Sequence, residues 1–224
     1  MSTDDLHAIS IALHLSDSQF PSGAFAFSWG LEAVVHGGIA GRSQLGALMA
    51  CELEDRWAPF DRVFIHRSMQ TESIEQLAVQ DEQFEEMAWS DVQRRSSRRA
   101  GAALLTAHAR LRTAGAIELR DALRTGQIRG HLPVVQGALF GNVGLSVPLA
   151  LIAAGHGLLM GLASAAVRLG VAGAIEAHEH VSGLRARLAI IASETPPNEP
   201  STFGPLLDIG MMRHAQAHSQ LFTS

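Results

Sequence analysis

A long stretch without charged residues limits what this chain can fold into. Residues 130–167 contain no Asp, Glu or Arg, and the whole chain has no Lys. A stretch of this length can either cross a bilayer or supply the buried helices of a core. Polar residues divide it into pieces of about a dozen residues, which is a length typical of core helices. The dividing residues are His131, Gln136, Asn142, Ser146, Pro148 and His156. We therefore predict two buried core helices here, with a membrane span as the alternative.

The rest of the chain has a helical pattern. Apolar residues recur every three or four positions, and the two-residue alternation of strands never persists. Helices are predicted over residues 4–15, 26–36, 91–113 and 174–194, and after Ser43 with a break or kink at Pro59. The sequence therefore predicts an all-α fold, a single-domain multi-helix bundle.

Two of these helices carry clear apolar faces. After Ser43 the face is formed by Leu45, Met49, Leu53 and Trp57. In 91–113 it is formed by Val92, Ser96, Ala100, Ala103, Leu104, Ala107 and Leu111. Gly101 lies beside the second face, and a glycine inside a helix costs about 1 kcal/mol relative to alanine. We expect another backbone to pass close to Gly101.

Composition narrows the class of protein. With 22 acidic and 17 basic residues the net charge is -5, which argues against binding nucleic acid through overall positive charge. Cys51 is the single cysteine, so it can form neither an intramolecular disulfide nor a cysteine-based zinc site. We expect Cys51 to be buried and inert. The start of the chain, with Asp4 and Asp5, does not resemble a secretory signal, and we expect a cytoplasmic protein.

Histidines suggest one possible metal site. His214 and His218 are four residues apart, so on a helix both rings share a face, as in zinc or nickel sites. No Glu lies between them to act as the general base of a metalloprotease. His178 and His180 point to opposite sides of a helix, and we expect them to be exposed. A histidine-based metallohydrolase remains an alternative.

The other candidate motifs favour a protein without catalysis. Arg94, Arg95, Arg98 and Arg99 could bind phosphate, but Asp91 precedes them at helical spacing and an acidic run lies upstream. A solvated and mutually paired face is the simpler interpretation. The sequence has no Gly-rich phosphate loop, no GxSxG elbow and no paired-carboxylate signature. We therefore predict a protein that is not an enzyme.

The C-terminal region is organised as a linker and a tail. Residues 195–207 are rich in proline, which fixes φ and removes a backbone donor, so they predict an irregular linker. Residues 208–224 predict an amphipathic tail with Met211, Met212, Leu221 and Phe222 as apolar anchors. We predict a helical body over 1–194. The tail could order on a partner or pack on its own body, and the residues leave both open.

The N-terminal stretch PSGAFAFSWGLE, residues 21–32, resembles the signature of the UreF-type urease accessory proteins. The family pattern is Pro-x-Gly-Gly-Phe-x-Tyr-Ser-x-Gly-Leu-Glu, with Ala24 and Phe27 here in place of a glycine and the tyrosine. The matching residues are Pro21, Gly23, Phe25, Ser28, Gly30, Leu31 and Glu32. A phenylalanine keeps the ring but lacks the hydroxyl, so one polar contact of the family is missing or made by water.

Further family matches run through most of the chain, from about residue 9 to 224. In the central part they are Asp81, Arg94, Ser97, Gly101, His131, Pro133, Val134, Gly137 and the stretch AAVRLG at 165–170. In the tail they are Asp208, Arg213, His214, Leu221, Phe222 and Ser224. His218 replaces the usual tail tyrosine, which adds a group that titrates near neutral pH.

The resemblance implies a function in urease maturation. Such a protein is expected to be all-α, to dimerise, and to have no catalytic activity and no tightly bound cofactor. It would dock UreD, also called UreH, through the N-terminal region and the tail, recruit the nickel-carrying GTPase UreG, and help deliver nickel to the urease apoprotein. Carried over to this chain, the partner-binding residues are Phe25, Phe27, Ser28, Gly30, Glu32, Arg213, His214, His218, Leu221 and Phe222. A UreF-like adaptor for another target remains an alternative.

Overall fold

The protein is an all-α structure in a computed structural model that describes residues 2–17, 20, 30–38 and 41–201. Within these ranges there is no β-strand. The elements are α1 (Thr3–Leu15), α2 (Leu31–His36), the short 3-10 helix η2 (Arg42–Gln44), α3 (Leu45–Cys51), the π-helix η3 (Glu52–Asp61), α4 (Arg62–Ser68), α5 (Ile74–Met87), α6 (Asp91–Arg110), α7 (Ala116–Arg124), α8 (Leu132–Asn142), α9 (Val147–Arg168) and α10 (Ala174–Ser193).

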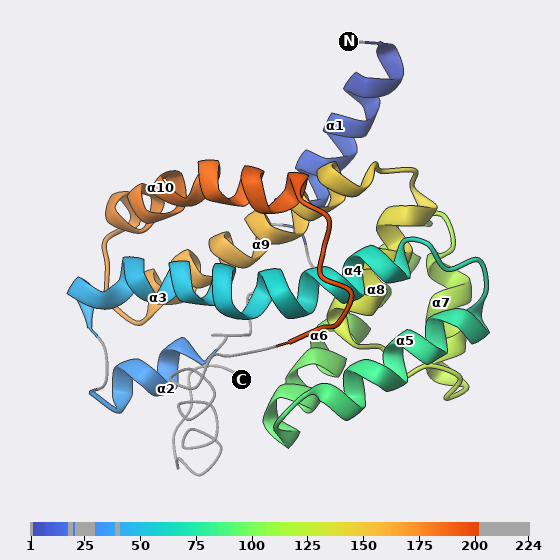
Figure 1. Ribbon diagram of the computed structural model, residues 1–224, viewed down its shortest axis with the longest axis horizontal. Helices are drawn as coiled ribbons and strands as arrows, with labels where there is room; N and C mark the ends of the chain where they lie inside the picture. Colours follow the sequence, from blue (N-terminus) through green and yellow to red (C-terminus); the bar gives the residue numbers. More distant parts are fainter. Residues whose placement is uncertain (1, 18–19, 21–29, 39–40, 202–224) are drawn as a thin grey trace.

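The uncharged stretch forms the two helices at the centre of the molecule. α9 packs against α1, α2, α3, η3, α4, α8 and α10, and α8 packs against α4, α5 and α6. Figure 1 shows α9 between α10 and α3, with α5, α6 and α7 gathered around α8 at the other end of the molecule. α9 is long and apolar enough to cross a membrane, but most residues of its most apolar part are buried inside the protein. The prediction of two core helices is thus confirmed for the described residues.

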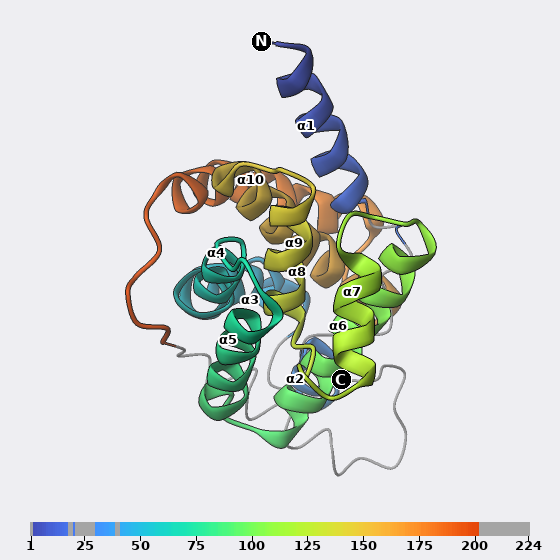
Figure 2. The same cartoon turned by 90° about the vertical axis from the view of Figure 1, so that its right-hand side faces the viewer.

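α1 packs on the body with only part of its length. Its Ala8, Ile11, Ala12 and Leu15 pack on the core, and the N-terminal part of the helix extends beyond the other helices in both views (Figures 1 and 2). It begins with a capping box in which Ser2 and Asp5 exchange side-chain-to-backbone hydrogen bonds. It ends at Leu15, as predicted.

The helix after Ser43 is not broken at Pro59, although a break was one of the two outcomes predicted there. Helical winding continues from α3 through η3 to α4, and Pro59 lies inside the π-helix. A proline has no N–H to donate, so a segment whose hydrogen-bond pattern is already altered can include it without a break. Leu45, Met49, Leu53 and Trp57 are all buried, as their spacing predicts.

Two other helix boundaries differ from the sequence prediction by more than one residue. α2 begins at Leu31 rather than at residue 26, because Gly30 has a left-handed backbone with φ 83° and cannot belong to the helix. α6 ends at Arg110 rather than at residue 113, because the N–H of Thr113 bonds back to the carbonyl of His108 at 3.0 Å and closes the helix. Leu111 therefore lies past the helix end and is exposed, although its spacing predicted an apolar face position.

Candidate functional site

The described part of the N-terminal signature starts α2. Gly30 is buried and takes the left-handed conformation that an L side chain rarely adopts, which explains a glycine at this position. Glu32 is fully buried, and its Oε1 lies 3.8 Å from Nδ1 of His36. Glu32 is therefore a buried residue of α2, and its contact with a partner stays a prediction. Phe25, Phe27 and Ser28 lie outside the described residues.

The C-terminal partner-binding residues also lie outside the described residues. They are Arg213, His214, His218, Leu221 and Phe222. Their roles, and the metal pair formed by two of them, stay predictions. The described chain includes the first part of the linker, residues 195–201, which is irregular and lies against the body (Figure 1).

Four of the residues that match the family in the middle of the chain, Asp81, Ser97, Gly101 and His131, meet at the start of α8. The buried Asp81 of α5 accepts hydrogen bonds from three successive backbone N–H groups: Arg129 at 2.5 Å, Gly130 at 2.7 Å and His131 at 2.9 Å. One carboxylate thus fixes the path of the chain into α8, and hydrogen bonds to a charged acceptor are stronger than neutral ones. We name the set Asp81, Glu85, Ser97, Gly101, Gly130 and His131 the α8 junction.

His131 is the second polar centre of the α8 junction. It is fully buried, its ring stacks on Phe84 with centroids 4.4 Å apart, and its Nε2 lies 2.7 Å from Oε2 of Glu85. Burial lowers the pKa of His131, while the Asp81 and Glu85 carboxylates act in the opposite direction. A carboxylate can only accept a hydrogen bond, so in this pair His131 Nε2 donates to Glu85. Arg98 pairs with the same carboxylate at 3.4 Å.

α6 supplies the third side of the α8 junction. Ser97 Oγ accepts the N–H of Leu132 at 3.1 Å. A Cβ on Gly101 would lie 2.0 Å from the carbonyl oxygen of Gly130, so the backbone approach expected at this glycine is confirmed. Sequence reasoning singled out Asp81, Ser97, Gly101 and His131 separately and missed Glu85. The spacing of Asp81 and Glu85, one helical turn apart, was the signal that could have found it.

A second buried polar group lies in η3. Arg56 Nη1 is 2.7 Å from Oε1 of Glu52 and 2.7 Å from Oδ2 of Asp61, and all three side chains are buried. Burial raises the pKa of Asp61, and the Arg56 charge opposes that rise. Breaking such a buried set is costly because it leaves an uncompensated charge inside the protein. Nothing in the sequence marked these residues as buried.

The described residues do not bring together three side chains that could hold a metal ion. His178 is exposed as expected, but His180 is half-buried and packs on Gly46 of α3. Cys51 is half-buried rather than buried. Burial, followed by the neighbouring Asp55, raises the pKa of its thiol to about 11, which disfavours the reactive thiolate.

The arginine cluster of α6 is partly paired, as predicted. Arg94 Nη2 lies 2.5 Å from Oδ1 of Asp91. Arg98 pairs with Glu85, while Arg95 and Arg99 are exposed.

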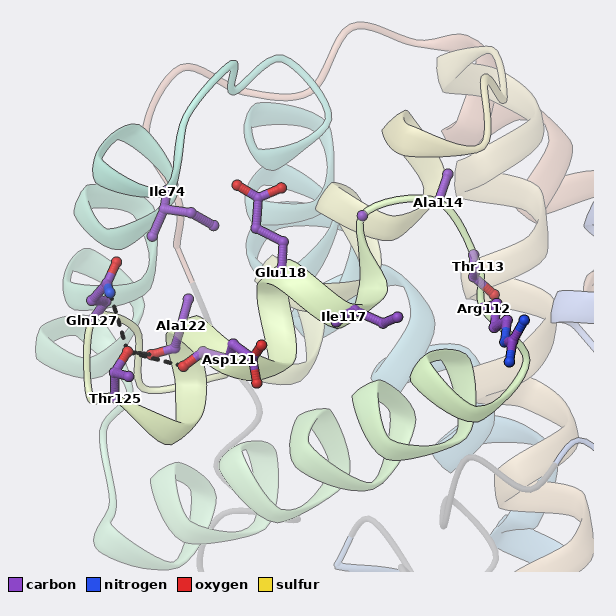
Figure 3. A pocket seen from close by; sticks show the side chains of 11 residues that line it. Ile74, Arg112, Thr113, Ala114, Ile117, Glu118, Asp121, Ala122, Thr125 and Gln127 are labelled. Atoms are coloured by element: carbon purple, nitrogen blue, oxygen red, sulfur yellow. Dashed lines mark hydrogen bonds between the residues drawn. The ribbon is translucent and has the colours of Figure 1, made fainter.

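The surface next to α7 carries an open pocket of about 750 Å³. It lies between the start of α5, the turn from α6 to α7, and α7 itself (Figure 3). Thr125 Oγ1 donates to the carbonyl of Asp121 at 2.9 Å and accepts from Gln127 Nε2 at 3.1 Å, while Glu118 and Arg112 lie apart from them (Figure 3). The polar side chains that line the pocket thus either hydrogen-bond within the group of Asp121, Thr125 and Gln127 or lie apart from it.

Comparison with known proteins places the chain in a family. The family model for UreF matches residues 39–185, which is more than half of the chain. A curated relative, "Urease accessory protein UreF" from Trichodesmium erythraeum (strain IMS101), is 30% identical over 225 residues, and the alignment covers 95% of each protein. The α8 junction lies within the matched region. From this full-length similarity we conclude that the chain belongs to the UreF family of urease accessory proteins.

Proposed function

We propose that this protein is a non-catalytic scaffold that assembles with UreD and UreG and helps deliver nickel to apo-urease. The observation that carries this proposal is the similarity to a urease accessory protein over 95% of both chains. The protein would work in the cytoplasm as a homodimer, holding its partners by shape. A metal could then pass between proteins without equilibrating with solvent, and a symmetric dimer would add avidity.

Two features of the body support a scaffold role. The buried polar groups of the α8 junction are engaged with one another across α5, α6 and the start of α8. Such networks favour one rigid arrangement, and a rigid body presents its partner-binding segments in a fixed geometry. Nickel is cargo in this proposal, so the protein needs no resident metal site.

The proposal is tested by deleting the gene in a urease-positive host. We expect urease activity and the nickel content of purified urease to fall, and both to return when the gene is supplied on a plasmid. A host that keeps normal activity and nickel content without added nickel would refute the proposal. If the deletion instead impairs another metalloenzyme, the protein is a UreF-like adaptor for a different target. Phe27 and His218 replace tyrosines of the family pattern, and such departures are what an adaptor for a different target would carry, so other metalloenzymes are assayed as well.

A further inference from the structure

The chain does not leave the body freely after α10. Residues 194–201, which we name the C-terminal strap, leave the end of α10 and pass across η3 and α4 (Figure 1). Two of its prolines, Pro196 and Pro200, are buried, while the residues between them are exposed. The strap is the first part of the stretch whose composition predicts an irregular linker.

Arg62 of α4 fixes the start of the strap. Its side chain is 5% exposed, and its guanidinium donates to the carbonyls of Ala58 at 2.9 Å, of Ile191, and of Glu194 at 3.4 Å. The last two carbonyls belong to the C-terminal end of α10, where a positive charge is favoured by the helix dipole. Arg62 thereby ends α10 and directs the chain toward α4.

Arg67 and Pro59 hold the rest of the strap. Arg67 is half-buried, forms no ion pair with another described residue, and donates to Oε1 of Gln83 at 2.9 Å and to the carbonyl of Asn198. The N–H of Ser201 donates to the carbonyl of Pro59 at 2.9 Å. The strap is thus fastened at its beginning, its middle and its end, each time to η3 or α4.

We propose that Arg62 and Arg67 are positioning residues for partner binding, because they fix the strap from which the sequence continues toward the C-terminal tail. This inference rests on the proposed function, in which the tail docks UreD. A flexible tether lowers the effective concentration of the segment that it carries at that segment's binding site. This effective concentration falls roughly as the -3/2 power of the tether length. The strap holds residues 195–201, which are seven of the thirteen residues in the predicted linker 195–207. Shortening a coil-like tether from thirteen residues to six raises the effective concentration of the tail about threefold.

The test compares Arg67→Ala in the full chain and in a chain that ends at Met212, with UreD of the same genome as the probe. In the full chain, Arg67→Ala should weaken UreD binding about threefold or more. In the shortened chain the same substitution should change nothing. Arg67→Lys should restore part of the affinity, because a lysine can still donate to the carbonyl of Asn198. Arg187→Ala is the matched control, since Arg187 forms an exposed ion pair with Glu54 at 3.3 Å away from the strap.

Hydrogen exchange separates positioning from a general loss of stability. Arg67→Ala should speed exchange at the Ser201 N–H while leaving α9 and α10 protected. Unchanged UreD affinity together with faster exchange would overturn the positioning role, and so would an equal loss of affinity in the shortened chain. If removal of residues 213–224 leaves UreD binding intact, tail docking itself is refuted, and the two failures are thereby distinguished. Arg62→Lys, checked for unchanged helicity, provides a second variant at the buried anchor.

Discussion

At the scale of single residues, the residue type at a few positions is determined by the neighbouring backbone that packs against them. Gly101 has helical geometry that any residue could adopt, and it is a glycine because the backbone of Gly130 crosses it. Gly183 of α10 is also inside a helix, but a Cβ there would meet nothing within 4 Å. The two glycines therefore differ in their surroundings and not in their conformation.

Gly101→Ala should destabilise the protein, because the new methyl group overlaps a backbone carbonyl that cannot move without disturbing the α8 junction. We expect a loss of roughly 1 to 3 kcal/mol in the free energy of unfolding, measured by urea denaturation. Gly183→Ala, as the matched control, should raise that free energy by up to about 1 kcal/mol through helix propensity. Shifts of the same sign in both variants would contradict the close approach.

His108 predicts a pH dependence of stability. The residue is buried in α6, its Nδ1 lies 2.9 Å from Thr113 Oγ1, and its ring packs on Phe20 with centroids 4.9 Å apart. Burial, with a smaller effect from His14, lowers its pKa from 6.5 to about 4. Between these values the unfolded chain binds a proton that the folded chain does not, so the contribution of His108 is present above pH 6.5 and lost as the pH falls toward 4.

His108→Asn keeps a polar group near Thr113 and removes the titration. Its unfolding free energy should therefore fall less steeply between pH 6.5 and pH 4 than that of the parent chain. His131, whose pKa is also lowered, leaves a residual slope in the variant. Parallel pH profiles of the two proteins, measured by chemical denaturation at several pH values, would exclude His108 as the source.

At the scale of elements, hydrogen bonds between residues far apart in the sequence determine which segments pack together, and local sequence patterns do not show this. The helices could be predicted because helical periodicity depends on neighbours three and four residues apart. Asp81 accepts hydrogen bonds from backbone N–H groups almost fifty residues away. The sequence pointed to Asp81 and to His131 separately, but it did not show that they are in contact. Glu52 and Arg56 have the spacing of an ordinary surface pair, and only tertiary packing buries them. Apart from the apolar anchors Leu221 and Phe222, the candidate partner-binding residues could be proposed only from family resemblance, and most of them lie outside the described residues.

Asp81→Asn tests whether the carboxylate fixes the start of α8. An amide presents one acceptor oxygen and an NH2 group, and the latter would face backbone donors. We expect a loss of about 1.5 to 3 kcal/mol in unfolding free energy. Glu82→Gln removes the neighbouring exposed acid, which pairs with Arg129 at 2.6 Å, and should cost less than about 1 kcal/mol. Equal effects of the two substitutions in urea denaturation would mean that Asp81 has no special role.

At the scale of the whole molecule, one apolar core joins the first helix to the last. Buried residues from α1, α3, η3, α5, α6, α8, α9 and α10 belong to a single cluster. α9 is the link, because it contacts both the α3 and α10 side and the α8 side. This continuity follows from the uncharged stretch, whose helices have no polar face to turn toward solvent.

A continuous core predicts cooperative unfolding of the described body. Loss of helix, followed by far-ultraviolet circular dichroism, and loss of tertiary packing, followed by near-ultraviolet circular dichroism, should have the same urea midpoint. Separate midpoints would indicate that the part around α5, α6 and α7 unfolds independently of α9 and α10. The shortened chain ending at Met212 serves as the control, and its two midpoints should also coincide.

The π-helix η3 has a consequence for how the length of this chain can vary. Each hydrogen-bonded ring in a π-helix holds one residue more than in an α-helix, so η3 stores an extra residue without ending the helix. Removing one residue between Glu52 and Asp61 could tighten this segment to an α-helix while α3 and α4 keep their faces toward the core. The same deletion within α9 would turn every later side chain by about 100°. We therefore expect relatives with single-residue length differences to place them in η3 rather than in the other long helices.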